Sequence, residues 1–92
     1  MILVKVEIYT SAMCGYCMRA KHLLEKKGVD FIEYDVTYDP GKRQEMTALT
    51  GKTAVPQVFI NDKPVGGYSD LVEFDVDDEL DNMLGLGIEL SQ

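Results

Sequence analysis

The sequence lacks three features that define large classes of proteins. No run of apolar residues is long enough to cross a bilayer, so we expect no contact with a membrane. Its 9 Lys and Arg residues against 16 Asp and Glu residues give a formal net charge of -7, which argues against nucleic acid as a partner. Its two cysteines are three positions apart, a poor structural staple for a secreted domain.

A single domain covering residues 1–92 is expected, because a chain of 92 residues can just bury one core. The first residues, Met1 to Val4, are followed by Lys5 and Glu7 and lack a basic leader or a cleavage site. They predict a strand rather than a signal peptide. We therefore expect a cytoplasmic protein.

The two cysteines form the motif Cys14-Gly15-Tyr16-Cys17, a spacing that suits reversible disulfide chemistry. Ahead of it, apolar residues alternate with polar ones from residue 2 to residue 9, the pattern of a strand with one buried face. Behind it, residues 18–27 contain no Gly or Pro and predict a helix that ends at Gly28. The free N–H groups and positive dipole end of that helix favour a thiolate on Cys14. We expect Cys14 to be the nucleophile and Cys17 the buried resolving thiol.

The rest of the chain predicts three more strands and two more helices. Residues 29–36 and 57–60 read as strands, and a fourth strand at Val65 follows a turn over residues 61–64. Asp39 and Pro40 begin a helix that ends at Gly51, with Met46 and Leu49 facing inward.

A last helix is predicted from Asp70, ended by Gly85 and Gly87 and followed by a loosely held tail over residues 88–92. Its expected apolar face is Leu71, Val72, Phe74, Val76, Leu80, Met83 and Leu84. Its acidic residues, from Asp75 to Asp81, are interpreted as a solvated face rather than a docking surface.

The order β-α-β-α-β-β-α excludes a simple doubly wound sheet, because the last two strands are too close for a crossover. It predicts an α/β fold in which a four-stranded mixed sheet carries helices on both faces.

Three groups of residues resemble landmarks of the glutaredoxin family, which has the thioredoxin fold. They are Ile8-Tyr9-Thr10 leading into Cys14-Gly15-Tyr16-Cys17 with Arg19-Ala20-Lys21, the segment from Thr50 to Ile60, and Gly66-Gly67-Tyr68-Ser69-Asp70-Leu71. They stand in the family's order, and the similarity covers about residues 4 to 84. The resemblance implies a glutathione-dependent thiol-disulfide oxidoreductase that reduces glutathionyl mixed disulfides and protein disulfides, acting as a monomer.

The resemblance also implies a catalytic pair and a glutathione site. Cys14 and Cys17 would carry the chemistry, and Pro56 would be a cis-proline that places the Val55 backbone opposite them. A trans proline at the start of a strand is the alternative. The residues implied for glutathione binding are Tyr16, Arg43, Val55, Pro56, Tyr68, Ser69 and Asp70.

Several of these residues have plainer roles available. Ser69 or Asp70 could simply be the N-cap of the last helix, and Arg43 could be a solvated surface residue. His22 is interpreted as a surface histidine rather than a catalytic base. A zinc site is the weakest hypothesis, because it needs four ligands and the chain offers Cys14, Cys17 and a badly placed His22.

The sequence departs from the family pattern at three positions. Gly15 replaces a common proline, Ser11 replaces a common lysine, and Ala54 replaces the usual threonine. Family members without the proline include carriers of a [2Fe-2S] cluster held by one cysteine per subunit, here Cys14, and by glutathione. The loss of the lysine favours a second alternative, a redoxin served by a flavin-dependent reductase.

Overall fold

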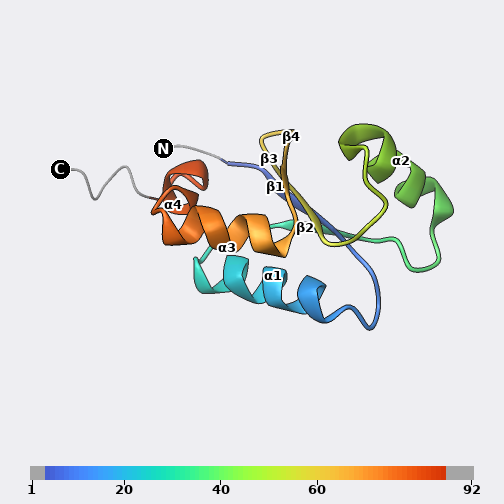
Figure 1. Ribbon diagram of the computed structural model, residues 1–92, viewed down its shortest axis with the longest axis horizontal. Helices are drawn as coiled ribbons and strands as arrows, with labels where there is room; N and C mark the ends of the chain where they lie inside the picture. Colours follow the sequence, from blue (N-terminus) through green and yellow to red (C-terminus); the bar gives the residue numbers. More distant parts are fainter. Residues whose placement is uncertain (1–3, 87–92) are drawn as a thin grey trace.

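A four-stranded sheet in the order β2-β1-β3-β4 organises the computed structural model, which describes residues 4–86 (Figure 1). Strand β1 (Val6–Thr10) runs parallel to β2 (Ile32–Asp35) and antiparallel to β3 (Gln57–Ile60). Strand β4 (Lys63–Gly66) pairs antiparallel with β3. The predicted mixed sheet is thus confirmed.

Helices cover both faces of the sheet, as predicted. Helices α1 (Gly15–Lys26), α3 (Tyr68–Val76) and α4 (Leu80–Met83) lie on one face, and α2 (Pro40–Thr50) lies on the other (Figure 1). The larger core, beneath α1, α3 and α4, consists of Val6, Ile8, Ala20, Leu24, Val58, Ile60, Leu71, Leu80 and Leu84. None of the helices in residues 4–86 combines the length and the apolar character that a bilayer span requires.

Strand β1 is buried on both faces, not on one. Val6 and Ile8 enter the larger core, as the alternation predicts. Tyr9, on the other face, is only 4% exposed because Phe59 and Met46 pack around it under α2. The predicted start of the strand, at residue 2, lies outside the described residues.

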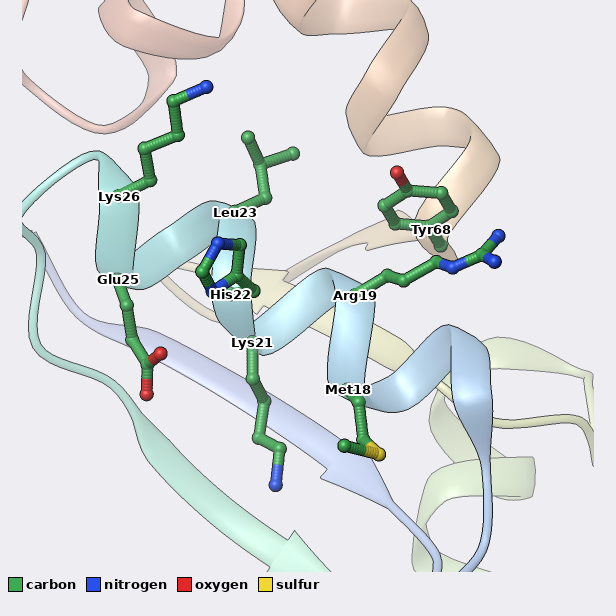
Figure 2. Close-up of a pocket in the computed structure, with 8 residues that line it drawn as sticks. All are labelled: Met18, Arg19, Lys21, His22, Leu23, Glu25, Lys26 and Tyr68. Atoms are coloured by element: carbon green, nitrogen blue, oxygen red, sulfur yellow. The ribbon is translucent and has the colours of Figure 1, made fainter.

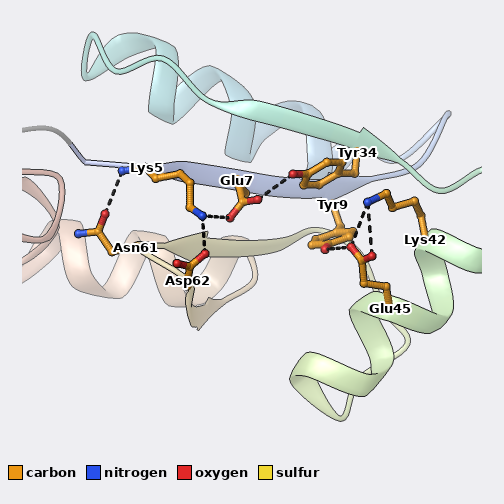
Figure 3. Close-up of polar contacts among 8 residues, drawn as sticks. All are labelled: Lys5, Glu7, Tyr9, Tyr34, Lys42, Glu45, Asn61 and Asp62. Carbon is orange, nitrogen blue, oxygen red and sulfur yellow. Dashed lines mark hydrogen bonds and ion pairs between the residues drawn. The ribbon is translucent and has the colours of Figure 1, made fainter.

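Polar contacts fix α2 on the sheet (Figure 3). The Tyr9 hydroxyl donates to the Glu45 carboxylate at 2.6 Å, and Lys42 forms an ion pair with the same carboxylate. Burial, followed by the bond to Glu45, raises the pKa of Tyr9, so its hydroxyl remains a donor at neutral pH. Together with the fully buried Met46, these contacts set the position of α2 and of the loop that follows it.

The prediction that α1 starts at residue 18 is wrong. The helix starts at Gly15 because Cys14 acts as its N-cap, with the Cys14 sulfur accepting a bond from the Cys17 N–H. Both ends of α2 match the prediction, with Asp39 accepting from the Lys42 N–H and Gly51 in the left-handed conformation. Leu49, however, points outward and is 55% exposed, so its predicted inward position is wrong.

Two strand predictions also need correction. Strand β2 is shorter than the predicted 29–36, because Val29 and Phe31 pack against the larger core before the chain joins the sheet. The turn between β3 and β4 is Asn61 and Asp62 alone, both with positive φ, and not all of residues 61–64. Positive φ at two successive residues matches the twist of a two-residue hairpin.

The predicted continuous helix from Asp70 is two helices, α3 and α4. Asp78 takes a φ of 62° and ends the first one, and Leu80 begins the second. Val76, placed on the apolar face by the sequence, is 75% exposed as a result. Lys27 holds the two segments together through ion pairs with Asp75 at 2.6 Å and Asp81 at 2.8 Å. Gly87 and residues 88–92 lie outside the described residues.

Candidate active site

The two cysteines differ sharply in exposure. Cys14 is partly exposed at the N-terminus of α1, and its sulfur accepts the Cys17 N–H at 3.1 Å. Cys17, in the first turn, is 1% exposed. Both are free thiols. A disulfide outside the protein can therefore reach only the Cys14 sulfur.

The environment of Cys17 favours the protonated thiol. Burial, and then hydrogen bonding with Cys14, raise the pKa of the Cys17 thiol to about 12, while the Ser11 N–H and the charge of Lys21 act in the opposite direction. At neutral pH Cys17 is therefore a neutral thiol. Cys14 is the thiol of the pair that an external disulfide can meet.

The loop before β3 faces Cys14. The peptide bond between Val55 and Pro56 is cis, as predicted. The Cys14 thiol lies 3.9 Å from the Val55 carbonyl oxygen, a weak donor contact. Among residues 4–86, no backbone or side-chain acceptor takes the Val55 N–H. One backbone donor is thus free beside the reactive sulfur.

A cavity of about 410 Å³ opens next to this loop. We call it the glutathione cavity, after the ligand expected from the sequence. Six of the predicted binding residues line it: Tyr16, Val55, Pro56, Tyr68, Ser69 and Asp70. Four others that were not among the predicted binding residues also line it: Lys52, Ala54, Gln57 and Gly67. The fold thus brings together residues from α1, from the loop before β3 and from the start of α3.

A hydrogen bond fixes Asp70 at the N-terminus of α3. The N-cap is Gly67, so the alternative that Ser69 or Asp70 is the cap residue is wrong. Asp70 caps from the third helical position, where its carboxylate accepts the Gly67 N–H at 2.9 Å. Gly66, at a φ of 115°, has no room for a side chain, because an added Cβ would overlap the Asp70 carboxylate.

Lys52 lines the cavity, whereas the predicted Arg43 does not. The Arg43 guanidinium donates to the Thr53 carbonyl at 3.0 Å and ties α2 to the following loop, outside the cavity lining. Lys52 lines this cavity and a neighbouring one of about 240 Å³. In the sequence, the one feature that points to Lys52 is its position directly after Gly51, whose left-handed conformation turns the chain out of α2.

Two tyrosines form one wall of the cavity. The rings of Tyr16 and Tyr68 lie 6.0 Å apart, and the Arg19 guanidinium lies 5.5 Å from the centre of the Tyr16 ring. Tyr16 is 61% exposed. The wall therefore offers aromatic surface to a ligand bound beside Cys14.

The loop that leads from β1 to Cys14 is tied to the end of β2 by hydrogen bonds. The Ala12 N–H donates to the Thr37 hydroxyl at 2.6 Å, and that hydroxyl donates to Asp35 at the end of β2. His22 is exposed on the outer face of α1 and lies apart from this loop, in a different cavity (Figure 2). Within residues 4–86, no three His, Cys, Asp or Glu side chains gather in a metal-binding arrangement.

Comparisons with known proteins agree with this geometry. The Glutaredoxin family model matches residues 6–65. Glutaredoxin 3 of Escherichia coli K12 is 47% identical over 79 residues, which are 86% of this chain and 95% of that protein. The solution structure of glutaredoxin from Brucella melitensis is 42% identical, with a TM-score of 0.81 and 92% of each chain covered. The crystal structure of a buckwheat glutaredoxin-glutathione complex is 28% identical, with a TM-score of 0.81, and covers 89% of this chain and 77% of that one.

Proposed function

This chain belongs to the glutaredoxin family and is a thiol-disulfide oxidoreductase, and from that premise we propose that glutathione is its reductant and glutathionyl mixed disulfides are its main substrates. Disulfides within proteins are the second substrate class of the proposal. The observation that carries it is the glutathione cavity, which starts at Val55, beside the Cys14 sulfur.

The first proposed step transfers glutathione to the enzyme. The Cys14 thiolate attacks the glutathionyl sulfur of a substrate mixed disulfide, so a new disulfide forms between Cys14 and glutathione. The substrate sulfur leaves as a thiolate and takes a proton from water. Because Cys17 is buried and neutral, Cys14 is the thiol that an external disulfide meets first.

The second step restores the enzyme. The thiolate of a second glutathione attacks the sulfur of the bound glutathione, which leaves as oxidised glutathione and returns Cys14 to the thiolate. For a protein disulfide, Cys17 takes this part instead. After Cys14 has attacked the protein disulfide, Cys17 attacks the Cys14 sulfur, and the Cys17 proton passes to the substrate sulfur that leaves. The product is a Cys14–Cys17 disulfide, which two glutathione molecules then reduce.

Groups that line the cavity can bind the polar groups of a γ-glutamyl tripeptide. The free Val55 N–H beside Cys14 offers strand-like pairing to the cysteinyl backbone of glutathione. Ser69 and Asp70, at the N-terminus of α3, offer groups for the α-carboxylate and the α-amine. The similar buckwheat protein is described as a complex with glutathione, which supports the same ligand here.

Lys52 is expected to bind the glycine carboxylate, and Arg43 to act only by holding the loop at Thr53. An exposed ion pair contributes about 0 to 1 kcal/mol, so Lys52→Gln should raise the KM for glutathione about threefold and leave kcat unchanged. Ser11→Lys, which restores the family's lysine, should lower that KM by a similar factor. Steady-state kinetics with a small glutathionyl disulfide give both values.

Lys63→Gln, a cation outside the cavity lining, is the matched control and should leave the KM unchanged. Arg43→Gln should lower the melting temperature, because it removes the bond to the Thr53 carbonyl. A raised KM in Arg43→Gln with an unchanged melting temperature, together with no response in Lys52→Gln, would assign the carboxylate to Arg43 instead.

Transport of a [2Fe-2S] cluster is the second candidate function. Gly15 favours it, because the family members that resemble this chain but lack the proline at this position include carriers of such a cluster. The position beside Cys14 is open, since a Cβ on Gly15 would meet no atom of this chain within 4 Å. One partly exposed thiol cannot hold a cluster alone, so the cargo would need Cys14 from two copies and two glutathione thiolates.

Anaerobically isolated protein should then be brown and dimeric in the presence of glutathione, and Gly15→Pro should reduce the cluster yield. Visible absorption and size-exclusion chromatography measure both properties. A colourless monomer after reconstitution with iron, sulfide and glutathione would rule out the carrier function and leave the oxidoreductase function untouched.

A further inference from the structure

A cavity of about 560 Å³ forms a groove along the exposed side of α1 (Figure 2). We call it the α1 groove. Its polar lining includes Arg19, Lys21, His22 and Lys26, and Tyr68 of α3 closes one end. In Figure 2, Arg19 and Lys26 lie on the side of α1 that faces α3. Of its lining residues, only Tyr68 also lines the glutathione cavity, and neither cysteine lines the groove.

Two cations of this groove, Arg19 and Lys26, have no carboxylate partner among the described residues, whereas four cations of the protein do. The carboxylate-paired ones are Lys5 with Glu7 and Asp62, Lys21 with Glu33, Lys27 with Asp75 and Asp81, and Lys42 with Glu45. In residues 4–86, neither Arg19 nor Lys26 has a carboxylate within ion-pair distance. The α1 groove also carries one carboxylate, Glu25, so its lining has an excess of positive charge on a chain with a net charge of -7.

The α1 groove borders the glutathione cavity. Tyr68 lines both. A third cavity, of about 300 Å³, shares Tyr16 with the glutathione cavity and Arg19 with the α1 groove. A polypeptide whose modified cysteine sits at Cys14 can therefore continue along α1 without leaving the protein surface.

We propose that the α1 groove binds an acidic segment next to the glutathionylated cysteine of protein substrates. The proposal rests on the glutathione-dependent function above and adds the class of protein substrate. Arg19 and Lys26 supply charges for Asp and Glu side chains of the substrate, and Leu23 supplies apolar surface between them (Figure 2).

A protein segment suits this groove better than a nucleic acid does. Glu25 lies among the lining cations, and the apolar side chains of Met18 and Leu23 offer nothing to a phosphate backbone. The net charge of -7 would repel a long polyanion beyond the groove. A short segment that alternates acidic and apolar residues meets both kinds of lining.

The test compares two glutathionylated peptides of equal length that differ only in carrying Glu or Lys beside the modified cysteine. The readout is the ratio of their kcat/KM values, so a general change in activity cancels. We expect the normal protein to prefer the acidic peptide about tenfold, because two exposed ion pairs contribute about 0 to 1 kcal/mol each. Added salt should shrink this preference.

The double variant Arg19→Gln, Lys26→Gln should reduce the preference about fivefold, from about tenfold to about twofold. Arg19→Glu, Lys26→Glu should reverse it in favour of the basic peptide. Lys63→Gln, which changes the net charge by one unit outside all of these cavities, is the matched control and should keep the preference.

An equal response of both peptides to the double variant, or the same response in Lys63→Gln, would overturn the proposal. Competition by a single-stranded oligonucleotide as strong as that by the unmodified acidic peptide would overturn the choice of a protein segment. A small glutathionyl disulfide, measured in parallel, separates the two levels: if the normal protein does not turn it over, the glutathione-dependent function itself has failed.

Discussion

Cys14→Ser should abolish reduction of every disulfide substrate, with a loss of at least about 10³-fold in kcat/KM. The reason is access. Cys14 is the partly exposed thiol at the start of α1, whereas Cys17 is 1% exposed and its pKa is raised to about 12. The remaining thiol in this variant is therefore both unreachable and neutral.

Cys17→Ser should behave differently for the two substrate classes. Deglutathionylation should continue, because glutathione in solution resolves the mixed disulfide on Cys14. Reduction of a protein disulfide that needs both thiols should be lost. Assays with a glutathionylated peptide and with a protein disulfide, run on both variants, separate these outcomes. An inactive Cys17→Ser together with an active Cys14→Ser would mean that the roles of the two thiols are reversed.

Gly66→Ala is expected to produce the largest loss of stability outside the buried core. A non-glycine residue in a sparsely populated backbone region costs of order 1–3 kcal/mol, and here the added Cβ also overlaps the Asp70 carboxylate. Moving Asp70 breaks its bond to the Gly67 N–H, a cap contributing about 1 kcal/mol. We expect a total loss of about 3 kcal/mol in the free energy of unfolding, and a raised KM for glutathione.

Gly28→Ala separates the cost of backbone strain from the cost of steric overlap with a neighbouring side chain. Gly28 also has a positive φ, 76°, but a Cβ there meets no atom within 4 Å. This variant should lose only about 1 kcal/mol and keep its KM for glutathione. Chemical denaturation and steady-state kinetics on both variants give the comparison. Equal losses in the two, with glutathione binding intact, would show that Asp70 does not depend on the glycine beside it.

Elements with explicit start and stop signals could be predicted from the sequence. Helix α2 matches at both ends, because Asp39 caps it and Gly51 ends it in the left-handed conformation. Helix α1 was placed too late, because a cysteine is not an expected cap and only the fold shows the Cys14 sulfur accepting the Cys17 N–H. The break at Asp78 has no Gly or Pro to announce it, and aspartate is among the few residues that tolerate a positive φ.

The candidate site could be predicted in its parts but not in all its contacts. Tyr16, Val55 and Asp70 belong to motifs with a recognisable order, and the fold brings them to one cavity. The directions of the Arg43 and Lys52 side chains depend on how α2 packs on the sheet. The bond between Tyr9 and Glu45 helps to fix that packing, and no local sequence pattern predicts it. The α1 groove could not be predicted from the sequence either, because its charge depends on which cations form ion pairs with carboxylates in the folded chain.

Glutathione dependence, the central claim, is tested most directly by trapping the mixed disulfide on the enzyme. Cys17→Ser is mixed with one equivalent of a glutathionylated peptide, and the intact mass of the protein is measured before and after adding free glutathione. We expect one glutathione attached to Cys14, located by peptide mapping, and its release as oxidised glutathione on addition of the free thiol. Attachment of the peptide instead of glutathione, or an adduct that glutathione does not remove, would contradict the proposed function.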